Sequence, residues 1–288
     1  MNGISREQVR TVAVIGTGLI GTSIALALRG NGVRTYLHDR DPEAAATAAA
    51  KGAGVLGLPS SAVDLAVIAV PPSCIAAVLA EYQATGLARC YTDVGSVKTA
   101  PLAEAEAAGC DLTSYVGGHP MAGGERSGPV AAKADLFRDR TWALTPLACT
   151  RADALRSVMD FVGMTGAHPL LMTHADHDRV VARTSHVPHL VASALAASLE
   201  GADESVLRLC GAGVRDATRI AAGDVTLWTD ILRANATEVS KILSEIATDL
   251  AAVAHSLPSD PEEVVGLLRR GNSGRALLIG EPTGVGNG

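Results

Sequence analysis

One histidine of this chain lies in a stretch that suits neither a core nor a surface helix. His119 occupies GGHPMAGGERSG (117–128), where glycines and small polar residues surround the dipeptide His-Pro. A neutral imidazole accepts protons near pH 7, since its unperturbed pKa is about 6.5. Pro120 biases the backbone of His119 toward extended conformations. The segment therefore predicts a general base presented on a loop, with glycines that leave clearance for a ligand.

A second stretch that predicts chemistry is GTGLIG (16–21), between the apolar run TVAVI (11–15) and a segment with helical periodicity. After a strand, Gly16 permits a tight turn, Gly18 lets a pyrophosphate approach the backbone, and Gly21 lets helix and strand pack closely. The free N–H groups at the helix N-terminus then face the phosphates. This context predicts a dinucleotide site.

Asp39 ends the next predicted strand, 18 residues after Gly21. An acidic side chain there accepts hydrogen bonds from both ribose hydroxyls, which favours NAD, whereas Arg40 beside it leaves NADP possible. The residues predicted to hold the cofactor are Gly16, Gly18, Leu19, Ile20, Gly21, Asp39, Arg40, Val70, Pro71 and Pro72.

These residues need a scaffold, and the pattern up to residue 172 supplies one. Short β-branched runs alternate with helical segments, which predicts a parallel sheet covered on both faces, in an α/β fold of modified Rossmann type. The predicted strands are 11–15, 33–39, 64–70, 90–94, 115–120, 141–146 and 168–172. Ligands bind outside the carboxyl ends of such strands, so the loops 71–73, 95–98 and 117–124 are expected to share one crevice with the glycine motif.

From residue 173 onward, strand patterns give way to helical periodicity. We therefore predict a dinucleotide-binding domain over 1–172 and an all-helical substrate and dimerisation domain over 173–288. The predicted helices cover 174–199, 204–222, 226–257 and 261–270, and the glycine-rich end GEPTGVGNG is expected to fray.

The composition excludes several classes of protein. The net charge is −6 and the pI is near 5.7, which gives no basic surface for nucleic acid. The five cysteines share no close spacing, as expected for reduced thiols in the cytoplasm. Neither a signal peptide nor an apolar run of about 18–20 residues is visible, so we predict a soluble cytoplasmic protein without membrane contact.

Three of the histidines at the start of the helical part, His177, His186 and His189, are further candidates for a site. On a straight helix, His177 and His186 are nine residues apart and lie about half a turn out of phase. His186 and His189 share a face, but without an accompanying carboxylate motif they make a poor ligand set, so no metal site is predicted. Pro188 can kink the helix and change this geometry.

Six motifs, in this order along the chain, together resemble the prephenate/arogenate dehydrogenase family of tyrosine biosynthesis. They are GTGLIGTSIA, DLAVIAVPP, TDVGSVK, GGHPMAGGERSG, HDRVVARTSHVPHL and RDATRIAAGDVTLW. HPMAG and SHVPH are far more specific than the glycine motif. The resemblance implies a modified Rossmann domain followed by a helical domain that builds a homodimer. It also implies NAD-dependent oxidative decarboxylation of prephenate to 4-hydroxyphenylpyruvate, or the same reaction on arogenate or on 4-amino-4-deoxyprephenate.

The resemblance further implies roles for single residues. The catalytic positions of the family are matched by His119, Ser96 and Glu125, with His119 and Ser96 at the substrate hydroxyl. The substrate-binding positions are matched by His186, His189, Arg219, His177 and Gly124, with Arg219 gripping a carboxylate. Many relatives have threonine where this chain has Gly124, which puts the shape of the pocket in question.

Two other classes stay open at this point. A β-hydroxyacid dehydrogenase shares the layout, but such enzymes rely on a lysine in the helical domain, where Lys241 is the only lysine after residue 133. A nucleotide-sensing protein without turnover would bind NAD and would not reduce it in the presence of any cyclohexadienyl substrate.

Overall fold

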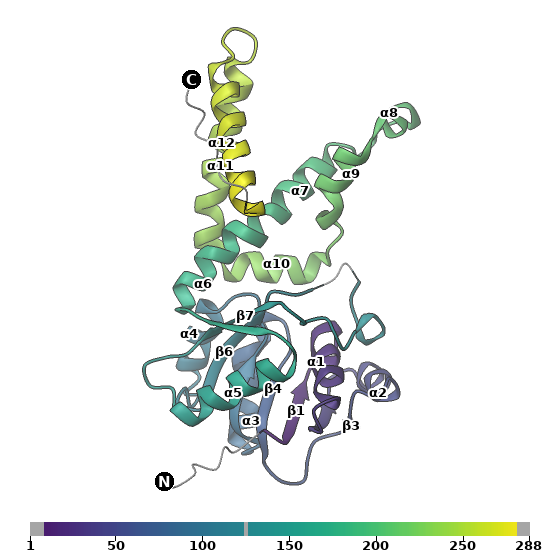
Figure 1. Ribbon diagram of the computed structural model, residues 1–288, viewed down its shortest axis with the longest axis vertical. Helices are drawn as coiled ribbons and strands as arrows, with labels where there is room; N and C mark the ends of the chain where they lie inside the picture. The colour runs from purple at the N-terminus through teal and green to yellow at the C-terminus, as the bar shows by residue number, and fades with distance from the viewer. Residues whose placement is uncertain (1–8, 124–125, 281–288) are drawn as a thin grey trace. The chain divides into compact units, whose positions relative to one another are not determined.

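An eight-stranded sheet organises the first of two compact units of the chain, residues 1–236 and 237–288. The computed structural model describes residues 9–123 and 126–280. From one edge to the other, the strand order is β3-β2-β1-β4-β5-β6-β7-β8. Figure 1 labels β1, β3, β4, β6 and β7 of this sheet. The strands are β1 (Thr11–Ile15), β2 (Arg34–His38), β3 (Val55–Leu56), β4 (Val63–Ile68), β5 (Ala88–Asp93), β6 (Tyr115–Pro120), β7 (Thr141–Thr145) and β8 (His168–Leu171). Only β3, two residues long, was not predicted.

Helices cover both faces of this sheet. Val12 and Val14 of β1 belong to an apolar core with α1, α2 and α5, whereas Ala13 and Ile15 belong to a second core with α3 and α4. Successive side chains of a strand point to opposite faces, so a strand buried on both needs an unbroken apolar run. These helices are α1 (Leu19–Arg29), α2 (Pro42–Ala50), α3 (Ile75–Ala84), α4 (Thr99–Ala107) and α5 (Ala152–Met164).

The prediction of a wholly parallel sheet is wrong at β7. β6 and β7 pair antiparallel, with His119 opposite Ala143, and β8 runs parallel to β7. The connection from β6 to β7 contains, in its described part, one 3₁₀ turn, η2 (Pro129–Ala131), and no α-helix. Without a helical crossover the chain returns beside β6 in the opposite direction. Arg140, just before β7, therefore lies at the edge of the sheet where β6 ends.

The helices that follow are shorter than predicted. A π-helical turn, η3 (Ala182–His186), divides 174–199: the Val187 N–H bonds five residues back to the Ala182 carbonyl, and Pro188 has no N–H to continue an α-helical ladder. The segments 204–222 and 226–257 break at residues 210–211 and at Asn235. The resulting elements are α6 (His174–Val181), α7 (Val187–Ala197), α8 (Glu204–Leu209), α9 (Ala212–Thr218), η4 (Arg219–Ala221) and α10 (Val225–Ala234).

The described part of the second unit contains two helices. α11 (Ala236–Ser256) and α12 (Glu262–Ile279) are linked by Arg270 Nη2, 3.0 Å from Asp249 Oδ1, and α12 extends well beyond the predicted end at residue 270. Most of the terminal GEPTGVGNG, residues 281–288, lies outside the described residues. The domain boundary at 172/173 stays a prediction. Within the described ranges, no helix is both long and apolar enough to cross a membrane.

Candidate active site

The glycine loop, residues 16–21, joins β1 to α1 as the sequence predicted. Gly16 has φ +99°, and a Cβ there would lie 2.2 Å from the Ala69 carbonyl oxygen. A Cβ on Gly21 would lie 1.9 Å from the Gly16 carbonyl oxygen. Around Gly18, by contrast, a Cβ would meet no atom of the described residues within 4 Å, and none of their side chains caps the N-terminus of α1 there. The loop combines close packing on two sides with an open, uncapped helix end, which fits a pyrophosphate.

Asp39 stands beside this loop, and its carboxylate is partly occupied. Oδ2 accepts from Thr17 N at 2.5 Å and Thr17 Oγ1 at 3.0 Å, while Oδ1 accepts from Asp41 N at 2.9 Å. Carboxylate oxygens have further lone pairs, so ribose hydroxyls can still be accepted. The other predicted cofactor residues lie at the same edge: Leu19 and Ile20 in the first turn of α1, exposed Arg40 after β2, and Val70, Pro71 and Pro72 after β4.

A chain of hydrogen bonds ends at His119, the half-buried residue of β6. Its Nδ1 lies 2.8 Å from His177 Nε2, and His177 Nδ1 lies 2.8 Å from Asp178 Oδ1. A carboxylate only accepts, so the His177 hydrogen is on Nδ1 and its Nε2 is a lone pair. His119 must then donate through Nδ1, which leaves a lone pair on His119 Nε2. Nothing in the described parts of the chain bonds to that Nε2, so the chain presents a base to a ligand.

Burial keeps this chain in its neutral form. Burial, followed by the nearby His177, Lys98 and His186, holds the pKa of His119 well below its ordinary value. Burial also lowers the pKa of His177, against the opposing hydrogen bond to Asp178. The pKa of Asp178 is lowered because burial is outweighed by hydrogen bonds, which include backbone N–H donors from Lys98 and Thr99. The result is an ionised carboxylate behind two neutral imidazoles.

A buried polar cluster supports the backbone around His119, and the sequence analysis missed it. Asp93, at the end of β5, accepts from Lys98 Nζ and from Tyr115 Oη at 2.5 Å, and Lys98 Nζ also donates to the Gly118 carbonyl at 2.6 Å. A Cβ on Gly117 would lie 2.5 Å from Thr145 Oγ1 and one on Gly118 2.6 Å from the Asp93 carbonyl oxygen. These two glycines make room for protein, not for a ligand as predicted. An aspartate and a lysine after a buried strand, in TDVGSVK, were the available signal.

His186 and His189 are brought into the site by the π turn. Both are buried, and His189 stacks on Trp228 with ring centroids 3.6 Å apart. His186 Nε2 and His189 Nδ1 have no hydrogen-bond partner within the described structure. The argument that His177 and His186 lie out of phase assumed a straight helix; a π turn needs more residues per turn and changes that phase. We call His119, His177, His186 and His189 the histidine cluster.

The remaining predicted site residues are Ser96, Arg219, Gly124 and Glu125. Ser96 lies half-buried in the loop between Asp93 and Lys98, and its hydroxyl makes no hydrogen bond to any described residue. Arg219 is exposed at the start of η4, beside Ile220, whose backbone is hydrogen-bonded to His189. Gly124 and Glu125 lie outside the described residues.

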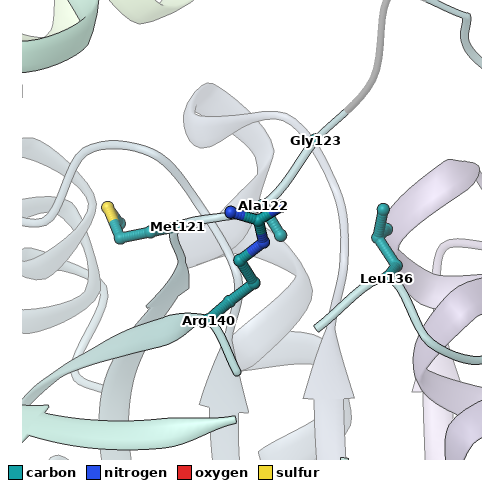
Figure 2. Close-up of a pocket in the computed structure, with 5 residues that line it drawn as sticks. All are labelled: Met121, Ala122, Gly123, Leu136 and Arg140. Carbon is teal, nitrogen blue, oxygen red and sulfur yellow. The ribbon is translucent and has the colours of Figure 1, made fainter. Parts of the chain in front are cut away.

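A pocket opens where β6 ends. It is lined by Met121, Ala122, Gly123, Leu136 and Arg140 (Figure 2). Arg140 was not predicted as a site residue; the antiparallel return of β7 brings it to the pocket that Ala122 also lines. An exposed guanidinium can bind an anionic group in this pocket.

With this geometry in place, comparison with known proteins identifies the family. The domain described as "Prephenate dehydrogenase, nucleotide-binding domain" matches residues 24–171, and "Prephenate dehydrogenase, dimerization domain" matches residues 173–269. The chain therefore belongs to the prephenate dehydrogenase family and is a dehydrogenase. The resemblance drawn from the motifs is confirmed.

Individual relatives agree. The chain is 44% identical over 250 residues to "Probable prephenate dehydrogenase NovF" of Streptomyces niveus, covering 86% of this chain and 69% of that protein. It is 33% identical over 264 residues to the cyclohexadienyl dehydrogenase of Zymomonas mobilis, covering 86% and 88%. The crystal structure of prephenate dehydrogenase from A. aeolicus, in complex with hydroxyphenyl propionate and NAD+, superposes with a TM-score of 0.83 at 27% identity, covering 96% of this chain and all of that one.

Proposed function

We propose that this protein is a prephenate dehydrogenase, which converts prephenate to 4-hydroxyphenylpyruvate with NAD. The observation that carries the proposal is the lone pair on His119 Nε2, which no described residue engages and whose position His177 and Asp178 fix. It lies at the edge of the sheet that also bears the open glycine loop. A ring hydroxyl in front of that nitrogen would lose its proton to it.

Proton removal and ring aromatisation make up the reaction. His119 Nε2 takes the proton of the hydroxyl at C4, and the bond from C4 to its hydrogen breaks as the carbonyl forms. Bound NAD supplies the acceptor for that hydride. Loss of CO₂ from C1 then gives the aromatic ring. Through Nδ1–H, the protonated His119 remains hydrogen-bonded to His177, and the ionised Asp178 behind it stabilises the positive charge.

Other residues of the chain position the reactants. Gly18 and the N-terminus of α1 would hold the pyrophosphate, and Asp39 the ribose. We assign Arg219 to a substrate carboxylate, which a planar guanidinium binds through two hydrogen bonds. Ser96 and Glu125 remain proposed partners of the reacting hydroxyl, and Gly124 a residue of the pocket wall. The part of the chain that matches the dimerization domain would pair two copies, which light scattering on the purified protein tests.

One assay tests the proposal. Purified protein is mixed with NAD or NADP and with prephenate, arogenate or 4-amino-4-deoxyprephenate, and nicotinamide reduction is followed by absorbance. We expect the highest kcat/KM with NAD and prephenate. Preference for arogenate or for the 4-amino compound would reassign the substrate, and no reduction with any of the three would overturn the proposal.

A further inference from the structure

Asn235 lies at the break between α10 and α11, and its side chain is buried inside the first unit. The Asn235 Nδ2 atom is 2.8 Å from the Asp178 carbonyl oxygen and 3.2 Å from His186 Nδ1. A carbonyl oxygen only accepts hydrogen bonds, so the amide NH₂ of Asn235 must face it. The second hydrogen of the same NH₂ group is then available to His186.

This contact sets the hydrogen position on His186. Because Asn235 donates, His186 Nδ1 must be the accepting lone pair, and the hydrogen of the neutral ring is on Nε2. Burial favours the neutral ring, since it lowers the pKa of His186 to about 4. His186 is 1% exposed, yet Nε2 has no partner among the residues described. A buried N–H donor without a partner is costly, which indicates that a ligand supplies the acceptor.

The acceptor has a defined chemistry. The titratable groups that face His186 are Asp178 and His177 of α6 and His119 of β6. Asp178 already accepts from two backbone N–H groups and from His177, and the two histidines bond to each other. A carboxylate or carbonyl oxygen of a small molecule beside His119 would complete the site, whereas an ammonium group would not.

We propose that Asn235 is a positioning residue that fixes the hydrogen of His186 on Nε2, so that this N–H donates to a carboxylate or carbonyl oxygen of the substrate. The role of His186 at the substrate rests on the proposed function. The same amide holds the Asp178 backbone, so one side chain orients both the hydrogen-bond chain behind His119 and the donor beside it.

The hydrogen position can be measured directly. In ¹⁵N-histidine NMR spectra of the substrate-free protein, we expect His186 to show a protonated Nε2 and an unprotonated Nδ1. The His186→Gln variant assigns the signals by their loss. A His186 protonated on Nδ1 would overturn the proposal whatever reaction the enzyme catalyses.

Kinetics of two variants separate positioning from packing. In Asn235→Asp the side chain keeps its shape, but its carboxylate can only accept hydrogen bonds, so His186 would carry its hydrogen on Nδ1. In Asn235→Leu the side chain keeps its volume and has no polar group. We expect the KM for prephenate at about pH 8 to rise roughly 10- to 100-fold in both, the effect of losing one buried hydrogen bond.

Lowering the pH distinguishes them. The new carboxylate of Asn235→Asp favours a doubly protonated His186, which again donates through Nε2, so KM should fall toward the wild-type value at about pH 6. Asn235→Leu should not recover. Equal behaviour of the two variants would refute the proposal. An inactive wild-type protein would instead refute the proposed function, and the NMR result would still decide the hydrogen position.

Discussion

The glycine loop and the histidine cluster lie at the same edge of the sheet but are built in opposite ways. The loop is one continuous segment, residues 16–21, and its proposed role in cofactor binding depends on backbone N–H groups and on the absence of side chains. The cluster gathers side chains from β6, α6, the π turn and α7, and acts through the placement of hydrogens. Changes in the loop should therefore act sterically on cofactor binding, and changes in the cluster should act on proton transfer.

Replacing the base should have the largest effect. His119→Asn removes the lone pair on Nε2, and we expect kcat to fall about 10²- to 10⁴-fold, as for loss of a general base. NAD binding should be unchanged, because the glycine loop is untouched. Stopped-flow and steady-state assays measure the first quantity and calorimetry the second. His168→Asn, a change at an exposed histidine of β8, is the matched control; near-normal turnover of His119→Asn would remove His119 from the mechanism.

The next largest effect should come from the residue behind the base. His177→Phe removes the acceptor for His119 Nδ1–H, and we expect kcat to fall about 10- to 100-fold, the usual cost of losing a supporting hydrogen bond. KM for prephenate should stay nearly constant, because His177 contacts His119. His177→Gln offers an accepting side-chain oxygen and should retain more activity. If both variants lost kcat equally, or changed KM alone, the hydrogen-bond chain would not orient the base.

In the glycine loop the predicted effect is about tenfold. A Cβ on Gly18 would meet no atom of the described residues within 4 Å and would enter the space proposed for the pyrophosphate. Gly18→Ala should therefore weaken NAD binding about tenfold, or 1.4 kcal/mol, at unchanged melting temperature. Gly21→Ala is the matched comparison, because its Cβ would lie 1.9 Å from the Gly16 carbonyl oxygen and should lower the melting temperature. Unchanged NAD binding in Gly18→Ala would mean that the pyrophosphate lies elsewhere.

The difference between a local segment and a site assembled from distant segments also determines which features the sequence could predict. The glycine loop and its flanking strand and helix are local, so spacing alone located Gly16, Gly18 and Gly21. The strand pattern singled out His119, because its segment follows a predicted strand at the same sheet edge, and its role as a base stays a prediction. Family resemblance assigned His177 to the substrate pocket, which stays a prediction, and the structure adds its hydrogen bond to His119.

The missed features depend on contacts between distant segments. Asn235 is 49 residues from His186 along the chain, and nothing in its neighbourhood distinguishes it from a surface asparagine. The π turn arises because Pro188 has no N–H to continue the α-helical hydrogen bonds. The prediction that His177 and His186 lie out of phase assumed a straight helix and left this effect out. The direction of β7 depended on the absence of a crossover helix within the described part of the 121–140 connection. Hydrophobic periodicity carries none of this information.

The smallest predicted effect concerns pH. In the proposed mechanism His119 accepts a proton only when it is unprotonated, so kcat/KM should fall once the pH drops through its pKa. Burial, together with His177, Lys98 and His186, holds that pKa well below the ordinary value. A histidine with a pKa of about 6.5 would be only about one quarter neutral at pH 6. We expect kcat/KM to change less than about twofold between roughly pH 7.5 and 6. A threefold to fourfold fall in kcat/KM over that range would show that the base is exposed to solvent and has an ordinary pKa of about 6.5.

Unfolding must be separated from titration in that experiment. In the unfolded chain histidines bind protons below about pH 6.5, whereas the buried neutral histidines of the folded protein do not. The unfolded state therefore binds more protons, and the free energy of unfolding decreases as the pH falls below about 6.5; for His186 the decrease continues to the folded-state pKa of about 4. Thermal melting at each pH, followed by tryptophan fluorescence, identifies the range where the protein stays folded. A loss of activity in the pH range where the protein stays folded measures the protonation of His119. A loss of activity that coincides with unfolding instead measures the cost of keeping the histidine cluster buried and neutral.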